Sequence, residues 1–420
     1  MNKVREGYKM TEIGEIPEEW EVSEIGRYIE NISKKNKDLN IQHVVSVTKY
    51  NGIVDSLEYF DKQVFSKDIS NYKIIKKDEF AYSTIHLNEG AIGYLKHCEN
   101  AVLSPMYTVF KVRNDLVNNY FLYNLLKSNK YINIYEMLGE GSVDRRSSIP
   151  FNKFKEIKVA MPPIEEQEKI SSILSTVDEQ IDNIDALIEK NKELKKGLMQ
   201  TLLTKGIGHT KFKNTEIGEI PEEWDVKKIG DICEVKGGKR LPKGYQLEDE
   251  DNAFPYIRVA DMYMGGIRQD DIKYVPKDIV DKIKNYKISK DDLFISVAGT
   301  LGIVGQVPYE LDGANLTENA DKLCNIQINK LYLMKVLQSN IVQSIIEAEQ
   351  TKSAQPKLAL TRIKEFLIPV PSDIEQVKIA SILMEVDEKI GQYKNKKQKL
   401  EELKKGLMQQ LLTGMIRVTV

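Results

Sequence analysis

The chain has 420 residues and a net charge of −2 at pH 7, with 41% hydrophobic and 30% charged residues. This composition fits two to four folded domains and excludes a disordered chain. No apolar run reaches the roughly 18 residues that a membrane-spanning helix needs, and the first residues lack the apolar stretch of a signal peptide. We therefore expect a cytoplasmic protein without a membrane partner, in which any nucleic-acid site is a local basic patch.

The decapeptide TEIGEIPEEW occupies residues 11–20 and returns unchanged at residues 215–224. Ten matched residues do not arise twice by chance in a chain of this length, so the sequence contains an internal duplication. About 150 residues follow each copy. Short alternating runs broken by Gly and Pro predict strands and hairpins there, with helices near 118–137 and 329–349. We expect two curled, mostly β globular domains with a few helices.

The two globular segments share a weak skeleton. The offset between matched pieces varies from 209 to 213 residues, which indicates that loops differ while the fold is kept. The matched pieces are KKDEFAYS (76–83) with SKDDLFIS (289–296), GAIGYL (90–95) with GTLGIV (299–304), FLYNLLKSN (121–129) with YLMKVLQSN (332–340), and FKEIKVAMP (154–162) with IKEFLIPVP (363–371).

Two long segments, 162–204 and 371–413, align without a gap at an offset of 209 residues. An ungapped match predicts helices of fixed length, since one inserted residue would rotate everything after it by about 100°. Apolar residues recur at alternating steps of four and three, which is typical of a coiled coil. The alternative is that each helix lies on the surface of its own domain. At 1.5 Å per residue, each helix would be about 60 Å long.

The predicted coiled-coil core has one apolar set in each helix. Asn191, Lys195, Lys397 and Lys404 continue the two stripes as polar residues. The apolar positions are Ile170, Leu174, Val177, Ile181, Ile184, Ile188, Leu198 and Leu202 in the first helix, and Ile379, Leu383, Val386, Ile390, Tyr393, Leu400, Leu407 and Leu411 in the second.

The repeat is circular. The junction between the halves reads GLMQTLLTKGIGHTKFKNTEIGEIPEEW, while the chain ends GLMQQLLTGMIRVTV and begins MNKVREGYKMTEIGEIPEEW. The two ends of the chain are thus the two sides of the central junction. If the long helices pack antiparallel, a pseudo-twofold axis relates the halves and the termini come close together.

Three loops carry candidate DNA-binding residues. Gly-containing loops let the backbone approach phosphates, and Arg can bind guanine bidentately. Such charge runs are also common in solvated loops, so both interpretations stay open. The candidates are Arg145, Arg146 and Lys153 before the first long helix, Lys352, Gln355 and Lys357 at the matching place of the second half, and Lys236, Lys239, Arg240 and Lys243 in the loop CEVKGGKRLPKGYQ. Arg362, Arg258 and Arg268 are further basic residues, and Tyr82 and Ser83 are either base contacts or core residues.

Enzyme motifs are missing from the sequence: it has no P-loop, nucleophile elbow, metalloprotease helix or methyltransferase signature. Gly299, Gly302 and Gly305 have no helix signal after them and predict a hairpin turn. The spacing of His43, His86 and the His97–Cys98 pair fits no common metal site. We therefore expect no catalytic residues, no metal and no cofactor. The odd number of cysteines (Cys98, Cys233 and Cys324) predicts buried thiols in a reducing compartment.

The ordered set of motifs resembles the specificity (S) subunit of type I restriction-modification systems. It comprises EIGEIPEEW in each half, PYIRVADM, VAGTLGIVG, PPIEEQEKISSIL and KKGLMQTLLT, and the resemblance covers essentially the whole chain. It implies two target-recognition domains that each read half of a split, asymmetric double-stranded DNA site. It also implies helices that act as a ruler, and docking of two methyltransferase subunits that carry the restriction subunits.

The sequence thus predicts an α+β protein with two mostly-β target-recognition domains separated by a long antiparallel two-helix coiled coil, in a pseudo-twofold circular repeat. The expected parts are the first target-recognition domain (1–160), the central helix (161–206), the second target-recognition domain (207–369), the C-terminal helix (370–413) and a tail (414–420).

Three functions compete on this sequence. The first is non-catalytic DNA recognition, with adenine methylation and ATP-dependent cleavage residing in partner subunits. The second is a coiled-coil scaffold whose globular domains bind proteins, which the absence of a basic excess keeps open. The third, a fused nuclease or methyltransferase, is disfavoured by the missing motifs.

Overall fold

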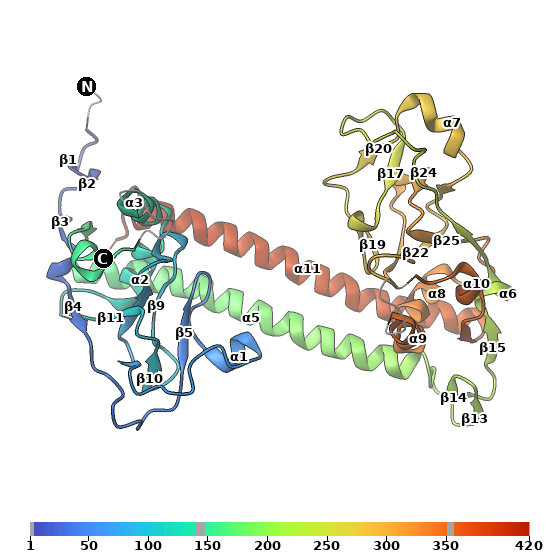
Figure 1. Cartoon of the computed structure of the whole chain (residues 1–420), viewed down its shortest axis with the longest axis horizontal. Helices are drawn as coiled ribbons and strands as arrows, with labels where there is room; N and C mark the ends of the chain where they lie inside the picture. Colours follow the sequence, from blue (N-terminus) through green and yellow to red (C-terminus); the bar gives the residue numbers. More distant parts are fainter. Residues whose placement is uncertain (1–3, 114, 140–147, 351–356, 420) are drawn as a thin grey trace. The chain divides into compact units, whose positions relative to one another are not determined.

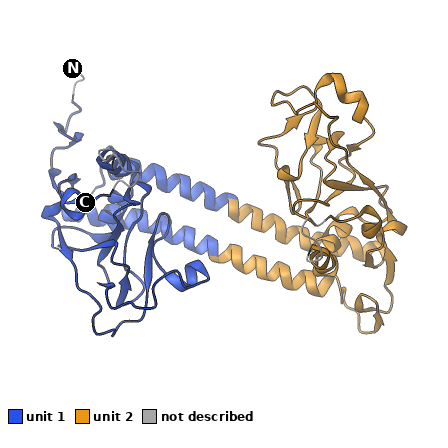
Figure 2. Cartoon of the chain, viewed as in Figure 1, with its two compact units in different colours: residues 1–185, 395–420 blue, residues 186–394 orange. Residues whose placement is uncertain are grey.

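The structure is a computed structural model that describes residues 4–113, 115–139, 148–350 and 357–419. The chain forms two compact units (Figure 2): unit 1 comprises residues 1–185 and 395–420, and unit 2 comprises residues 186–394. The long helices α5 (Ile164–Leu202) and α11 (Asp373–Leu411) each contribute residues to both units (Figure 1). Each of the two aligned segments, 162–204 and 371–413, thus contains one long helix, as predicted.

Unit 1 combines short strands with a few short helices. Its strands are β1 (Tyr8–Thr11), β2 (Gly14–Pro17), β3 (Glu21–Glu24), β4 (Ile29–Ile32), β5 (Val45–Thr48), β6 (Gly52–Asp55), β7 (Lys73–Lys76), β8 (Phe80–Ser83), β9 (Ile92–Tyr94), β10 (Asn100–Leu103), β11 (Tyr107–Val112) and β12 (Lys158–Met161). Its short α-helices are α1 (Ser56–Phe60), α2 (Asn119–Leu126), α3 (Asn129–Gly139) and α4 (Phe151–Phe154).

Unit 2 has the same mixture of strands and helices. Its strands are β13 (Phe212–Thr215), β14 (Gly218–Pro221), β15 (Asp225–Lys228), β16 (Glu234–Gly237), β17 (Pro255–Ile257), β18 (Met262–Tyr263), β19 (Gly266–Ile267), β20 (Lys273–Tyr274), β21 (Lys287–Ile288), β22 (Leu293–Ser296), β23 (Val304–Gln306), β24 (Ala314–Leu316), β25 (Ala320–Cys324) and β26 (Leu367–Val370). Its short α-helices are α6 (Ile229–Ile232), α7 (Val280–Ile283), α8 (Lys330–Leu337), α9 (Asn340–Gln350) and α10 (Leu360–Lys364).

One antiparallel sheet recurs in both units with the same topology. Its strand order is β4-β11-β8-β9 in unit 1 and β16-β25-β22-β23 in unit 2. The registers also correspond, because Phe80 faces Phe110 in unit 1 as Leu293 faces Leu323 in unit 2. In each unit, two consecutive helices and a short strand pair, β3–β12 or β15–β26, complete the shared part. The duplication therefore includes the globular fold.

The rest of each globular part differs. Unit 1 inserts the two-stranded sheets β5–β6 and β7–β10, whereas unit 2 inserts a mixed four-stranded sheet of order β20-β17-β24-β21. The main hydrophobic core of each unit nevertheless includes residues from the long helices. Ile170 and Leu174 pack into the core of unit 1, and Ile379 and Leu383 pack into that of unit 2. The shared skeleton is thus anchored on the helices, and the divergent pieces form separate hydrophobic clusters with residues of the shared sheet.

Turn chemistry explains why the decapeptide folds alike in both places. β1–β2 and β13–β14 are hairpins whose strand β2 or β14 begins at a glycine with a left-handed backbone, Gly14 (φ 108°) and Gly218 (φ 102°). Side chains other than glycine rarely adopt this conformation. The Thr11 hydroxyl donates to the Gly14 carbonyl at 2.7 Å, and Thr215 does the same to Gly218.

Several local predictions are confirmed. The β22–β23 hairpin contains Gly299 and Gly302, both with positive φ, as the glycine spacing predicts. Helices α2–α3 and α8–α9 fall in the two ranges expected for helices. Among the described residues, no helix is both long and apolar enough to cross a membrane.

One open alternative is decided and one expectation needs correction. Tyr82 and Ser83 are both buried, and the Tyr82 hydroxyl donates to the Ile149 carbonyl at 3.1 Å, so Tyr82 is a core residue. Cys233 and Cys324 are buried as expected, but Cys98 is only half-buried because it lies at the surface turn before β10. Burial raises the pKa of all three thiols, and that of Cys233 reaches about 12.

Candidate nucleic-acid interface and docking grooves

The repeated decapeptide ends on a buried tryptophan that contacts the start of a long helix. In unit 1 the Trp20 indole N–H donates to Glu166 Oε2 at 3.0 Å. Glu166 is 1% exposed and also accepts two bonds from the Arg417 guanidinium, at 2.8 and 3.0 Å. Residues from the first decapeptide, the central helix and the C-terminal tail therefore meet at one buried carboxylate.

Unit 2 repeats the contact between tryptophan and glutamate, but other residues take the place of Arg417 as the further partners of the glutamate. The Trp224 indole donates to Glu375 Oε2 at 3.0 Å. His209 Nε2 lies 3.0 Å from Glu375 Oε1, and the Ile207 backbone N–H donates to the same oxygen at 2.9 Å. Glu166 and Glu375 are 209 residues apart and correspond in the repeat. The unchanged decapeptide is explained by this shared docking at the helix start.

The glutamine that follows each glutamate ties the helix start to the globular part. Gln167 donates to the Pro162 carbonyl at 2.9 Å and accepts from the Asn118 backbone N–H at 2.9 Å. Gln376 makes the same two bonds, to Pro371 and from Asn329, both at 2.8 Å. Asn118 and Asn329 are the N-caps of α2 and α8, so the EQ motif fixes one short helix against each long one.

Further along each long helix, an aspartate pairs with a lysine of the other long helix. In unit 1, Lys404 Nζ lies 2.6 Å from Asp178 Oδ1, and Lys397 Nζ lies 2.6 Å from Asp185 Oδ2. These pairs show that the two helix segments of this unit run in opposite directions. In unit 2, Lys195 Nζ lies 2.6 Å from Asp387 Oδ1.

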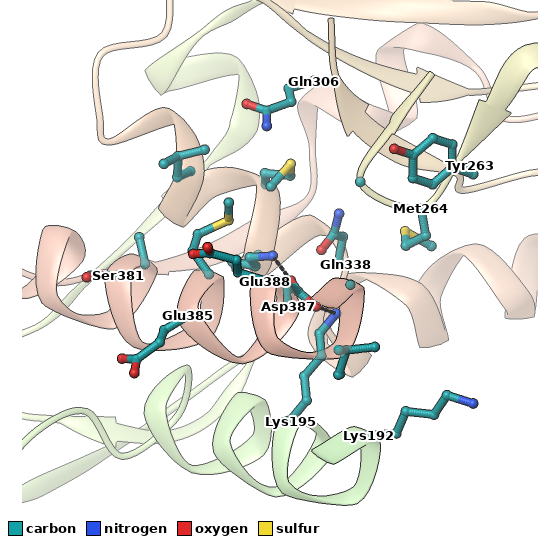
Figure 3. Close-up of a pocket in the computed structure, with 18 of the residues that line it drawn as sticks. Lys192, Lys195, Tyr263, Met264, Gln306, Gln338, Ser381, Glu385, Asp387 and Glu388 are labelled. Carbon is teal, nitrogen blue, oxygen red and sulfur yellow. Dashed lines mark hydrogen bonds and ion pairs between the residues drawn. The ribbon is translucent and has the colours of Figure 1, made fainter. Parts of the chain in front are cut away.

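The aspartate of each unit has a second partner on a short helix (Figure 3 labels Asp387, the aspartate of unit 2). The Tyr120 hydroxyl of α2 donates to Asp178, and the Lys335 ammonium of α8 donates to Asp387. Lys335 is only 2% exposed, and this burial lowers its pKa. Burial by itself raises the pKa of Asp387, but hydrogen bonds from Lys195 and Lys335 outweigh it and lower that pKa.

The residues of the apolar stripe are all at least half-buried. In α5, the polar stripe position Asn191 is also buried (8% exposed), and Lys195 is half-buried in its ion pair. The fully buried members are Ile170, Leu174, Val177, Ile184, Ile188, Leu202, Ile379, Leu383, Val386, Ile390 and Leu411, and the half-buried members are Ile181, Leu198, Tyr393, Leu400 and Leu407.

Of the candidate DNA-binding residues, three gather at one pocket of unit 2. Lys239, Arg240 and Lys357 line a hollow of about 410 Å³ whose wall also includes Gly237 and Asp321. Lys357 reaches it because its backbone forms an isolated β-bridge with Ala298. The pocket therefore joins two segments that are more than 100 residues apart in the sequence.

The remaining candidates do not line this pocket. Lys236 is exposed and pairs with Glu234 on its own strand at 2.5 Å. Lys243 is exposed in the loop after β16, and Lys153 is exposed on α4 of unit 1. Four candidates (Arg145, Arg146, Lys352 and Gln355) lie outside the described residues.

Asp321 is a site residue that the sequence prediction missed. It is 5% exposed and lies on β25 opposite Gly237. Its Oδ2 has no hydrogen-bond partner among the described residues. Burial raises the pKa of Asp321 to about 6, and the nearby charge of Lys357 only partly opposes this. The sequence did contain a signal for it. Residues two apart on a strand share a face, so Asp321 is an acid on the same face as the buried Leu323.

The metal interpretation of the histidines has no support among the described residues, where no group of three His, Cys, Asp or Glu side chains is placed to hold an ion. His43 instead pairs with Asp55, with 2.7 Å between Nε2 and Oδ2.

Two equivalent grooves lie between a long helix and the turn of a short helix pair. The groove of unit 1 has a volume of about 560 Å³ and that of unit 2 about 420 Å³. In each groove, one wall comes from that repeat's own copy of the Lys-Lys-Gly-Leu-Met-Gln stretch, and the other wall includes a Ser-Asn pair. The paired lining residues are Lys404 and Lys195, Lys405 and Lys196, Met408 and Met199, Gln409 and Gln200, Thr413 and Thr204, Ser128 and Ser339, and Asn129 and Asn340.

The grooves differ at one matched position that is lysine in unit 1 and glutamine in unit 2, although the lining residues of both carry the same formal net charge. Lys127 lines the unit 1 groove and donates to the Lys49 carbonyl at 2.9 Å; burial and the charge of Lys404 lower its pKa to about 8. The matching residue in unit 2 is Gln338, which donates to the Val304 carbonyl at 3.1 Å. We call this pair of surfaces the twin grooves.

A larger groove of about 1040 Å³ occurs in unit 2 (Figure 3). Tyr263 and Met264 of the globular part line it, together with the Lys335–Asp387–Lys195 ion pairs of the helices. Tyr263 and Met264 are each nearly half exposed. This surface combines an apolar rim with a charged floor.

A duplicated mixed α/β unit, with each copy anchored on a pair of long helices, defines a two-domain binding protein. The sequence model of the type I restriction modification DNA specificity domain matches residues 17–195 and again residues 221–402. The chain belongs to this family, whose members are the non-catalytic specificity subunits of type I restriction-modification systems.

Known proteins are similar over nearly the whole chain. The putative type I restriction enzyme MjaX specificity subunit of Methanocaldococcus jannaschii is 31% identical, with 98% of this chain and 97% of that protein covered. The solved type I S subunit from M. genitalium is 20% identical, with a TM-score of 0.56 and 97% of both chains covered. A chain from a study of type I R-M complex assembly is 14% identical, with a TM-score of 0.58, covering 96% of this chain and 99% of that one. The solved structures show a shared fold.

Proposed function

We propose that each globular domain of this chain reads one half of a bipartite, asymmetric double-stranded DNA site. The observation that carries the proposal is the contrast between copies. The contacts of Trp20 with Glu166 and of Trp224 with Glu375 are the same, whereas the inserted sheets between them differ. A common frame with unlike domains suits two unlike half-sites.

We further propose that α5 and α11 form an antiparallel coiled coil that sets the spacer between the half-sites. The buried apolar stripe and the pairs Asp178–Lys404 and Lys195–Asp387 support this arrangement. These two pairs are equivalent in the repeat, because Asp178 corresponds to Asp387 and Lys195 to Lys404. Helix length changes only in fixed steps of 1.5 Å per residue, which makes it a suitable ruler.

The twin grooves are proposed as docking sites for two methyltransferase subunits, one on each repeat. Two surfaces built from the same residues fit two copies of one partner. Restriction subunits would join through the methyltransferases. The Met side chains and the paired lysines offer a flexible apolar contact beside a positive charge, which suits an acidic, apolar helix of the partner.

The test is selection from a randomised duplex library by the full chain with its co-expressed methyltransferase, followed by sequencing. We expect a split motif with a fixed spacer. Replacing residues 25–150 with the matching part of a relative should change one half of that motif and leave the other half unaltered. A simultaneous change of both halves would contradict separate readers.

The scaffold alternative makes the opposite prediction for DNA. A protein-binding scaffold of net charge −2 should not retain random duplex DNA, even at low salt, where phosphate contacts are strongest. Filter binding at low and high salt therefore separates the two functions. Retention that falls steeply with salt supports DNA recognition.

A further inference from the structure

We propose that Asp321 is a base-reading residue of the second globular domain, and that its carboxylate accepts a hydrogen bond from the exocyclic amino group of a cytosine or an adenine. This inference rests on the proposed function, because it requires the domain to read DNA. It adds a specific residue, a pocket and a chemical preference that can be tested.

One oxygen of the Asp321 carboxylate is buried without a hydrogen-bond partner among the described residues. Asp321 is only 5% exposed, and its Oδ2 accepts no hydrogen bond from the described residues. A buried polar group without a partner costs free energy, and most native structures avoid it. A ligand with a hydrogen-bond donor would satisfy this oxygen.

The pocket that contains Asp321 is surrounded by basic side chains. Lys239, Arg240 and Lys357 line the same hollow as Asp321. Arg240 is oriented by Glu318, with 2.8 Å between Nε and Oε1, and its side chain stays 78% exposed. Lysine and arginine at a rim bind phosphates and position a duplex, whereas groups inside the hollow read base edges. Two acids and three cations line the hollow, and because Glu318 already pairs with Arg240, Asp321 is the acid left to contact a ligand.

A glycine leaves space beside the Asp321 carboxylate. Gly237 lies opposite Asp321 in the β16–β25 register and brings no side chain to the pocket. A Cβ added at Gly237 would lie 3.4 Å from Asp321 Oδ1. The glycine therefore leaves space beside Oδ1. The terminal torsion of Asp is soft, so the carboxylate can turn its unpartnered Oδ2 toward a donor in that space.

The position of Asp321 in unit 2 is occupied by a different kind of residue in unit 1. The sheet registers place Thr108 of β11 where Asp321 lies on β25, because Thr108 faces Tyr82 and Asp321 faces Ile295. Thr108 is neutral, and its hydroxyl lies beside the Tyr82 side chain, which fills this part of unit 1. Equivalent positions thus carry an acid in one domain and a hydroxyl in the other, as expected if they serve unlike half-sites.

The chemistry fixes the direction of the preference. An ionised carboxylate only accepts hydrogen bonds. In the major groove, cytosine and adenine present an amino donor, whereas thymine and guanine present oxygen acceptors at the corresponding place. Asp321 should therefore favour cytosine or adenine by about tenfold or more over thymine and guanine at one position of one half-site.

The experiment compares the library motif of the wild-type complex with those of Asp321→Asn, Gly237→Ala and Thr108→Val. The Asn variant keeps the shape but adds a donor, and the Ala variant covers the carboxylate with one methyl group. Both should relax the preference at a single cytosine or adenine of one half-site. Thr108→Val should leave that half-site unchanged.

Duplexes carrying the same base without its amino group identify the contact and distinguish the two bases. The wild type should lose about tenfold in affinity when the amino group is removed from the contacted cytosine or adenine, and Asp321→Asn should lose much less. An unchanged motif in Asp321→Asn and Gly237→Ala, with full sensitivity to the missing amino group, overturns the inference while leaving the proposed function intact. A wild-type complex that selects no motif overturns both.

Discussion

Lys404 Nζ lies 2.6 Å from Asp178 Oδ1 in unit 1, and the repeat places Lys195 Nζ 2.6 Å from Asp387 Oδ1 in unit 2. The two pairs are equivalent, but their surroundings are not. Asp178 has a neutral second partner in Tyr120, whereas Asp387 also neutralises Lys335, which is 2% exposed. Equivalent ion pairs therefore carry different energetic weight in the two repeats.

We predict that Asp387→Ala destabilises the protein more than Asp178→Ala does. Removing Asp387 leaves the buried Lys335 without a counter-charge, which costs about 3–5 kcal/mol. Removing Asp178 leaves a half-buried lysine and a hydroxyl, for which about 1–2 kcal/mol is expected. Urea unfolding of the two variants measures the difference. Lys335→Met should restore most of the stability of Asp387→Ala, and equal losses in the two single variants would refute the argument.

The C-terminal tail should contribute to the stability of unit 1 through one residue. Arg417→Ala removes two of the three side-chain hydrogen bonds to Glu166, which is 1% exposed, and leaves only that from Trp20. We expect the free energy of unfolding to fall by about 2–3 kcal/mol, because the buried carboxylate of Glu166 loses its charged partner. Arg417→Lys should recover only part of it, because lysine cannot form the bidentate contact.

The control for the tail is Glu166→Gln combined with Arg417→Ala. A neutral amide needs no cation, so the double variant should be more stable than Arg417→Ala alone. Thermal unfolding followed by circular dichroism measures all three. If Arg417→Ala unfolds like the wild type, the tail is not part of the folded unit in solution.

Asp321 should give the stability of the protein a specific pH dependence. Its folded pKa of about 6 lies above the unfolded value of about 3.9, so the folded state binds the proton more tightly. Unfolding free energy should therefore fall as the pH rises from about 4 to about 6, and the full penalty remains at pH 7–8. Asp321→Asn cannot ionise and should be more stable than the wild type by about 1–3 kcal/mol at pH 8.

That difference should vanish below about pH 4, where Asp321 is protonated in both states. The other charged groups that line the same pocket are Lys239, Arg240, Lys357 and Glu318. Denaturant midpoints of both proteins from pH 4 to pH 8 provide the test. A variant that is less stable than the wild type at pH 8 would show that the carboxylate has a partner in the folded state.

The twin grooves predict a partner stoichiometry that single variants reduce stepwise. Lys405→Glu should repel an acidic partner helix from unit 1, and Lys196→Glu should do so in unit 2. Each single variant should bind one methyltransferase subunit in place of two, and the double variant should bind none. Native mass spectrometry of the co-expressed complex counts them. Two bound subunits in the double variant would place the docking surface elsewhere.

The ruler predicts a change of spacer without a change of half-sites. Deleting residues 182–185 from α5 removes about 6 Å of helix and turns the following stripe by only about 40°. At about 3.4 Å per base pair, the spacer should shorten by one or two base pairs. Deleting two residues turns the stripe by about 160° and should abolish assembly. Methylation-site mapping with an unchanged spacer and full activity would eliminate the ruler.

Local chemistry made much of the architecture readable from the sequence. The glycines that begin β2 and β14 require a left-handed backbone, so the hairpins follow from the letters themselves. The ungapped heptads of 162–204 and 371–413 predicted α5 and α11, because a helical stripe depends only on residues three and four apart. The duplication and its circular order were likewise visible without coordinates.

The tertiary structure alone decided which distant residues meet. Glu166 and Arg417 are 251 residues apart, and Asp321 meets Lys357 only because a β-bridge brings the latter back to the end of the sheet. Such contacts depend on strand register and chain crossing, which no local pattern encodes. For the same reason Tyr82, which follows a strand pattern in the sequence, is a core residue, while a buried acid on the corresponding sheet of the other unit is the candidate reader.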